Sequence, residues 1–139
     1  MACAQPTLSI CLSCRDGREA DDGTRGGTRL ADRVVQAFSA RDRPQMVLRG
    51  VRCMSQCKRP CVVSLSAPER FTYLFGDLSP ADQTHVTALF DLVQSFSASE
   101  DGFLERKERP LPLRASILGR LPPLESRSTL VSDLGPQRV

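Results

Sequence analysis

Two closely spaced cysteine pairs constrain the fold of this 139-residue chain more than any other feature of its sequence. Cys11 and Cys14 form a C-x2-C motif, and Cys53 and Cys57 form a C-x3-C motif. Each pair comes at the end of a short apolar run of the kind that is typical of a β-strand. The sequence therefore predicts two strands that each end in a loop carrying cysteines.

A helix is predicted between these two strands, which are residues 7–11 and 45–52. Leu30, Val34 and Phe38 recur at helical spacing, so one face of this segment is apolar. A strand–helix–strand unit with a right-handed crossover makes its two strands parallel. Their carboxyl ends then lie at the same edge of the sheet, where open α/β sheets bind ligands. We therefore expect the two cysteine pairs to meet in space.

Two more strands are predicted at residues 62–66 and 71–75, joined by a turn into an antiparallel hairpin. Phe71, Tyr73 and Phe75 alternate with smaller residues, so one face of the last strand should be buried.

A second helix should follow, with Ser79 as its N-cap, Pro80 at its first position and an apolar stripe over residues 86–96. Thr28 is the predicted N-cap of the first helix. The fold class is therefore α/β (α+β), with the order β-α-β-β-β-α around a four-stranded mixed sheet.

The composition of the chain changes after residue 98, where charged residues and proline become frequent. We expect residues 1–98 to form the domain, residues 99–123 to be an extended C-terminal arm packed on it, and residues 124–139 to be disordered. A short helical turn is predicted at residues 114–118. The arm should pack through five apolar side chains: Leu111, Leu113, Ile117, Leu118 and Leu121.

Composition also limits the cellular setting. The first residues have no basic segment and only a broken apolar run, so they do not predict an export signal. No stretch approaches the ~20 apolar residues of a membrane span, so we expect a cytoplasmic protein that does not enter membranes. Aromatic residues make up 5% of the chain and the basic residues are scattered, which argues against nucleic-acid binding. The sequence makes no prediction of oligomeric state.

Cysteines in a reducing compartment are typical of metal sites or redox thiols rather than of disulfides. Thiolates are soft, charged donors, and four of them can hold one tetrahedral zinc ion or one [2Fe–2S] cluster. Cys11, Cys14, Cys53 and Cys57 are therefore the predicted metal ligands. Cys61 could pack beneath the loop, or serve as an alternate ligand or resolving thiol.

The segment VRCMSQCKRPCVVSLSAPERFTYLFGDL at residues 51–78 resembles an uncharacterised bacterial family of predicted metal-binding proteins. CLSCR at residues 11–15 and ERPLPLRASILGRLPP at residues 108–123 share this resemblance. That family in turn is similar to the thioredoxin-like [2Fe–2S] ferredoxins, including a small subunit of respiratory NADH dehydrogenases, in which a C-x3-C loop precedes a β-hairpin. The resemblance implies a thioredoxin-like fold and a ligand role for Cys53 and Cys57.

In the ferredoxins the first cysteine pair is spaced more widely than Cys11 and Cys14. Members of the family often occur near genes of cobalamin synthesis or cobalt handling, which implies a link to cobalt metabolism. The resemblance does not supply a reaction, and no catalytic residue is predicted.

The predicted function is a [2Fe–2S] electron carrier or redox sensor, with Lys58 and Arg59 placed to dock an acidic redox partner protein. A thioredoxin-like thiol oxidoreductase using Cys11 and Cys14 is one alternative. It is weakened because about a dozen residues separate the motif from the helix that would lower a thiol pKa. A zinc or cobalt carrier using the same four sulfurs is the other.

Overall fold

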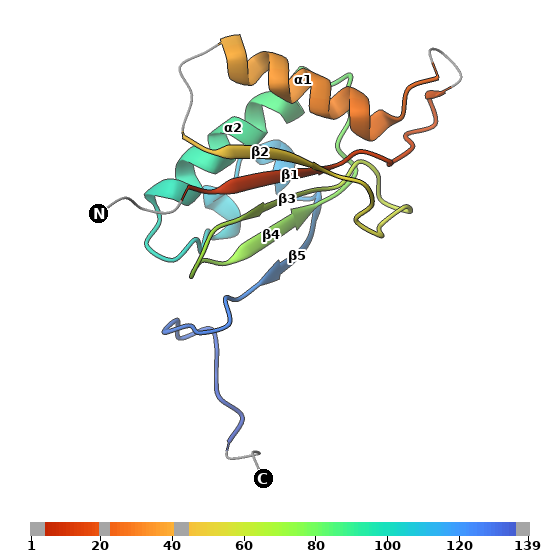
Figure 1. Ribbon diagram of the computed structural model, residues 1–139. Coiled ribbons are helices and arrows are strands. Elements are labelled where there is room, and N and C mark those ends of the chain that lie inside the picture. The colour runs from red at the N-terminus through yellow and green to blue at the C-terminus, as the bar shows by residue number, and fades with distance from the viewer. Residues whose placement is uncertain (1–4, 20–22, 41–44, 136–139) are drawn as a thin grey trace.

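The computed structural model describes residues 5–19, 23–40 and 45–135. The elements follow in the order β1 (Thr7–Cys11), α1 (Gly26–Ala40), β2 (Val47–Val51), β3 (Val63–Ser66), β4 (Thr72–Phe75), α2 (Gln83–Ala98), the 3-10 turns η2 (Arg106–Glu108) and η3 (Leu111–Leu113), and β5 (Ile117–Leu121) (Figure 1). Among the described helices, none combines the length and apolar character that a membrane crossing requires.

The sheet is mixed and has the order β2-β1-β3-β4-β5. β1 and β2 are parallel, with Cys11 opposite Val51, and every other pairing is antiparallel. The predicted parallel pair and the β3–β4 hairpin are therefore confirmed. The sheet has five strands rather than four, because the C-terminal arm adds β5 along β4.

One face of the sheet forms the core. Alternate residues of β3 and β4 are buried, as are Phe71, Tyr73 and Phe75, which confirms the buried face predicted from their alternation. Both helices lie against this face (Figure 1). They contact each other where the rings of Phe38 and Phe90 stack, with their centroids 6.3 Å apart. A layer of helices on one side of a mixed sheet is a common solution for burying a single apolar face.

Both predicted helix N-caps were wrong. α2 begins at Gln83 with Asp82 as its N-cap, because the Thr84 amide donates to Asp82 Oδ1 at 2.9 Å. Ser79 lies in the turn before this cap, where its hydroxyl accepts from the Ala81 amide at 3.2 Å. Thr28 lies inside α1 instead of capping it.

The arm packs through fewer apolar side chains than predicted. Leu113 is fully buried, and Ile117 and Leu118 are partly buried against the core, whereas Leu111 and Leu121 are 73% and 50% exposed. The predicted helical turn at residues 114–118 was wrong, because the 3-10 turn η3 ends at Leu113 and β5 begins at Ile117. Beyond β5 the chain leads away from the sheet (Figure 1).

Candidate metal centre

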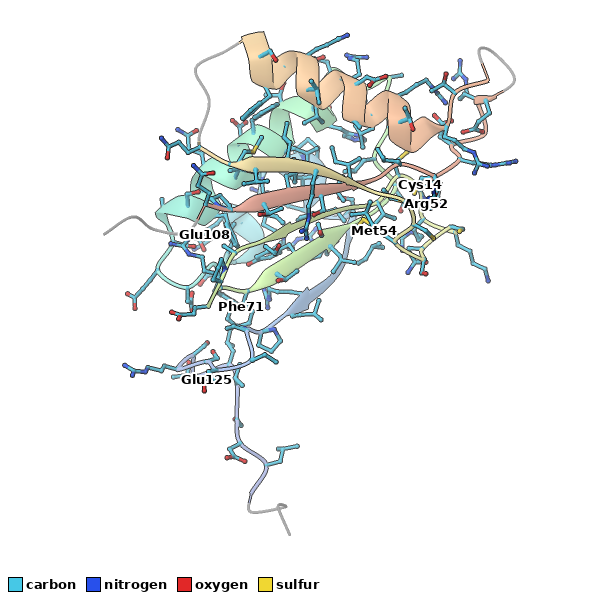
Figure 2. All side chains as sticks on the ribbon, in the orientation of Figure 1. Cys14, Arg52, Met54, Phe71, Glu108 and Glu125 are labelled. Carbon is cyan, nitrogen blue, oxygen red and sulfur yellow. The ribbon has the colours of Figure 1, made fainter. Side chains whose placement is uncertain are left out.

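The two loops that carry the cysteine pairs leave the sheet at the same edge. The Leu12 amide donates to the Val51 carbonyl at 2.8 Å, which continues the β1–β2 ladder by one step. The Cys11 amide donates to the Val62 carbonyl at 3.0 Å, so the chain after the second loop also returns to this point. Figure 2 shows Cys14, Arg52 and Met54 close together at this end of the sheet.

A cavity of about 280 Å³ lies between the two loops. It is lined by Cys11, Cys14, Cys53 and Cys57, together with Ser13, Arg15, Arg25, Ser55 and Gln56. The structure thus brings the four predicted ligand residues together. Within the described residues, no three Cys, His, Asp or Glu side chains already have the arrangement of a formed metal site.

The four cysteines divide into two inner and two outer ones. Cys11 and Cys14 are 3% and 5% exposed, whereas Cys53 and Cys57 are exposed on the opposite loop. The cavity therefore has a buried wall of one pair and an accessible rim of the other.

Hydrogen bonds distinguish the two inner thiols. Burial opposes ionisation of Cys11, but the Cys14 thiol and the amides of Ser13 and Met54 donate to its sulfur and lower its pKa. Burial and the neighbouring Cys11 raise the pKa of Cys14 to about 11. The negative charge of the pair is therefore best accommodated on Cys11.

The outer loop is shaped by its backbone. Ser55 adopts a left-handed conformation with a φ of 60°, and its amide points at Cys53 Sγ, 3.4 Å away. The Arg59 amide closes the following turn by donating to the Gln56 carbonyl at 3.1 Å. This loop therefore presents an amide donor to an outer sulfur, as Met54 does to the inner Cys11 sulfur.

The first turn of α1 packs directly on the C-x2-C segment. The Gly27 amide donates to the Cys14 carbonyl at 3.0 Å, and the Thr28 hydroxyl donates to the Leu12 carbonyl at 2.9 Å. A Cβ on Gly27 would lie 1.9 Å from the Cys11 carbonyl oxygen, so only glycine fits this approach. The helix therefore positions the backbone of the inner pair.

Glu19 ties the connecting loop to this helix. Its carboxylate accepts from the amides of Asp16 at 2.9 Å, Gly17 at 3.1 Å and Gly26 at 3.0 Å. Burial opposes ionisation, but these amides lower the pKa of Glu19 to about 2. Arg29 adds an ion pair with Asp16 at 2.5 Å.

Cys61 does not line the cavity. Its side chain is fully buried in the core. Its amide donates to the Leu78 carbonyl at 3.2 Å, which holds this residue beneath the loop. Burial, followed by the charge of Cys14, raises the pKa of Cys61 to about 12.

The positive charge at the cavity comes from residues that the sequence did not single out. Arg15 and Arg25 line it, and Arg25 Nη1 donates to the Ser13 carbonyl at 3.0 Å. Arg59, which was predicted to dock an acidic partner, pairs with Asp77 at 2.5 Å, and its docking role stays a prediction. The position of Arg15 directly after Cys14 was a usable signal, but nothing in the sequence indicated that Arg25 returns to the site.

The residues at the cavity fit a thiolate-bound metal. All four sulfurs come from two loops that converge on one space, and amides already point at the sulfurs of Cys11 and Cys53. Soft thiolates with amide donors are typical of iron–sulfur and zinc sites. Because Cys14 is protonated at neutral pH without a metal, binding would displace its proton.

Two solved structures of a thioredoxin-like [2Fe–2S] ferredoxin from Aquifex aeolicus resemble this chain. One has a TM-score of 0.50 at 14% identity and covers 87% of this chain and 97% of its own. The other, the wild-type protein at 1.5 Å resolution, has a TM-score of 0.47 at 15% identity and covers 83% of this chain and 97% of its own. The first likeness shows that the fold is thioredoxin-like, as predicted.

A comparison with curated proteins gives no significant match. The family model described as "Protein of unknown function (DUF1636)" matches residues 8–123, which is most of the chain. This match confirms the resemblance to an uncharacterised family that the cysteine loops and the arm indicated. The chain therefore belongs to the DUF1636 family.

Proposed function

We propose that this protein holds a [2Fe–2S] cluster through Cys11, Cys14, Cys53 and Cys57 and works in the cytoplasm as an electron carrier or redox sensor. The observation that carries the proposal is the single cavity lined by these four side chains. A bound cluster would supply one-electron redox chemistry that the side chains alone lack.

The amides of the two loops would tune such a site. Donors from Ser13 and Met54 reach the sulfur of Cys11, and the Ser55 amide reaches that of Cys53. Hydrogen bonds to thiolate sulfur stabilise negative charge there and so favour the reduced state. The buried inner pair keeps water from one side of the site, which strengthens these interactions.

The outer pair marks the side from which a redox partner protein would approach. Cys53 and Cys57 are exposed, and the guanidinium groups of Arg15 and Arg25 lie at the same cavity. Positive charge beside an accessible redox site attracts an acidic partner surface. A role in cobalamin or cobalt metabolism rests on the family resemblance and stays a prediction.

Anaerobic purification after iron-replete expression tests the proposal directly. The protein should be reddish-brown and should contain iron and acid-labile sulfide in equal amounts. Colourless protein with stoichiometric zinc, or protein with stoichiometric cobalt and no acid-labile sulfide, would instead support a metal carrier that uses the same four sulfurs.

A thiol oxidoreductase is the second candidate, favoured by the opposite pKa shifts of Cys11 and Cys14. In the structure the first turn of α1 does contact the C-x2-C segment, but its Gly27 amide and Thr28 hydroxyl donate to backbone carbonyls and not to a thiol, which weakens this candidate. Reduction of oxidised glutathione by the metal-free protein separates the two proposals. An oxidoreductase loses this activity in Cys11→Ser and keeps it in Cys53→Ser, whereas a cluster protein loses iron in both.

A further inference from the structure

The C-terminal arm gathers arginines around a second cavity. This cavity measures about 600 Å³ and is lined by Phe103, Glu105, Arg106, Arg109, Ile117 and Arg120. Arg114 lies beside Arg106 in an adjoining hollow of about 310 Å³. Figure 2 shows Glu108 of this segment toward the end of the sheet opposite Cys14. None of the described cysteines lines the arginine cavity, so it is separate from the candidate metal centre.

In the part of the chain that the structure describes, no carboxylate forms an ion pair with any of these four arginines. They bond mainly to carbonyl oxygens: Arg106 to that of Arg114 at 3.1 Å, Arg114 to those of Arg109 and Lys107 at 2.9 Å each, and Arg120 to that of Leu104 at 3.3 Å, and Arg120 also has a hydrogen bond with the Tyr73 hydroxyl. A guanidinium carries five N–H donors, so most of the donors in this cluster remain available.

Arg109 is the central member of the cluster. Its side chain lines the cavity although the residue is only 6% exposed, and its Nε is buried without a hydrogen-bond partner among the described residues. The bond from its Nη1 to the Leu104 carbonyl is long at 3.5 Å. Burying a charge without a counter-charge is unfavourable, so binding of an anion beside the Arg109 guanidinium would be stabilising.

The charges of three neighbouring arginines add to the positive potential at Arg109. Burial is the main cause that lowers its pKa; Tyr73 opposes the shift, and the charges of Arg120, Arg106 and Arg114 add to it. Repulsion of this kind is relieved when an anion binds among the guanidinium groups.

The acidic residues of the segment have other partners. Glu105 pairs with Lys107 at 3.7 Å, and Glu108 accepts from the Glu105 amide at 2.8 Å. The Glu105 carboxylate at the cavity wall therefore pairs with Lys107 and forms no ion pair with the arginines among the described residues.

We propose that this cavity binds the phosphate group of a small ligand through Arg106, Arg109 and Arg120. The paired N–H donors of a guanidinium group fit the spacing of two phosphate oxygens. A phosphate dianion also neutralises several positive charges better than a single carboxylate does. The cavity is larger than one phosphate group requires. Phe103, whose ring lies 4.2 Å from Arg120 Cζ, and Ile117 give it an apolar wall for the rest of the ligand.

Titration of the anaerobically purified full chain with inorganic phosphate at constant ionic strength tests the proposal. Isothermal titration calorimetry should give one saturable site. In ¹⁵N spectra the Nε–H signal of Arg109, identified by its loss in Arg109→Lys, should shift as phosphate is added. Absence of saturable binding, or an unchanged Arg109 signal, would overturn the proposal.

Matched variants locate the site. Arg106→Gln removes an exposed guanidinium with a single carbonyl contact and should weaken phosphate binding about fivefold, and Arg109→Lys should weaken it about tenfold. Arg127→Gln makes the same charge change on the exposed C-terminal segment and should bind like the unaltered protein. If Arg106→Gln and Arg127→Gln weaken phosphate binding equally, the effect comes from net charge alone and the proposed site is rejected.

Two further measurements complete the test. Acetate at matched ionic strength should bind more weakly than phosphate, and equal affinity would reject the phosphate assignment. Iron content should be the same in Arg106→Gln and the unaltered protein, because this site does not depend on the proposed cluster.

Discussion

The five described cysteines have the same side chain but lie in different environments. Cys11 and Cys14 are buried at the cavity wall, Cys53 and Cys57 are exposed at its rim, and Cys61 is buried outside it. The four cysteines at the wall and rim line one space, whereas Cys61 is enclosed by the core. Ligand and packing roles can therefore be separated one residue at a time.

Serine substitution should divide the cysteines into these two groups. Cys53→Ser, Cys57→Ser and Cys11→Ser should each lose most of the bound iron, because serine keeps the size of the side chain but removes the soft thiolate. Cys14→Ser should also lose iron, since Cys14 lines the same cavity. Iron and sulfide analysis of each anaerobically purified variant provides the measurement.

Cys61→Ser is the matched control. It should retain iron and lose about 1–3 kcal/mol of unfolding free energy, because a hydroxyl replaces a thiol in a fully buried site. Loss of iron in Cys61→Ser together with its retention in Cys57→Ser would show that the ligand assignment is wrong.

At the scale of elements, the site depends on how α1 begins against the exit of β1. The Gly27 amide donates to the Cys14 carbonyl and the Thr28 hydroxyl to the Leu12 carbonyl. The Glu19 carboxylate ties the loop between this segment and α1 to the first residue of the helix. The geometry of the inner cysteines is thus a consequence of one close contact between a helix and a strand end.

Gly27→Ala should disrupt this contact. The added Cβ would meet the Cys11 carbonyl oxygen at 1.9 Å, so the helix or the C-x2-C segment must move, at a cost of about 3 kcal/mol in unfolding free energy. Gly119→Ala in β5 is the control, since no atom lies within 4 Å of its added Cβ. That variant should be unchanged or more stable by roughly 0.5 kcal/mol. Chemical denaturation of both variants would test the comparison.

Glu19 should make stability depend on pH. Its pKa is about 2 in the folded chain and 4.5 as the ordinary value, so its stabilising effect is complete above about pH 4.5 and is lost as the pH falls toward 2. The melting temperature of Glu19→Gln should therefore be lower than that of the unaltered protein at pH 6, and the difference between the two melting temperatures should be smaller at pH 4. Circular dichroism melts at both values provide the measurement.

Glu125→Gln is the control for this effect, because Glu125 lies on the C-terminal segment beyond the sheet (Figure 2). Its melting curve should follow that of the unaltered protein at both pH values. A constant difference between Glu19→Gln and the unaltered protein from pH 6 to pH 4 would contradict the capping role of the carboxylate.

At the scale of the whole molecule, the arm is part of the sheet. β5 pairs with β4, the buried Leu104 amide donates to the Tyr73 hydroxyl at 2.6 Å, and the Leu113 side chain is fully buried. The arm thus completes the core and also builds the arginine cavity.

Truncation should separate the arm from the residues beyond it. Removing residues 124–139 should leave melting temperature and iron content unchanged, because the described side chains there are largely exposed. Removing residues 110–139 deletes β5 and Leu113 and should cost at least about 2 kcal/mol of unfolding free energy. Equal melting temperatures of the two truncated chains would show that the arm does not stabilise the domain.

The sequence by itself determined the central elements of the fold and the meeting of the cysteine pairs. Alternating and helical apolar spacing are local properties, and the handedness of a strand–helix–strand crossover leaves one arrangement for β1 and β2. Helix starts were harder to predict, because the N-cap of α2 and the glycine start of α1 depend on what each end contacts.

Only the tertiary structure decided which thiols are buried, how the arm pairs and where the arginines gather. Ile117–Leu121 is too short and mixed to identify as a strand until β4 offers an unpaired edge. Arg25 and Arg109 line cavities with residues that lie elsewhere in the sequence. Their places at these cavities could therefore not be predicted from the residues next to them in the chain. Burial and electrostatic environment are set by residues far apart in sequence, and these become neighbours only when the chain has folded.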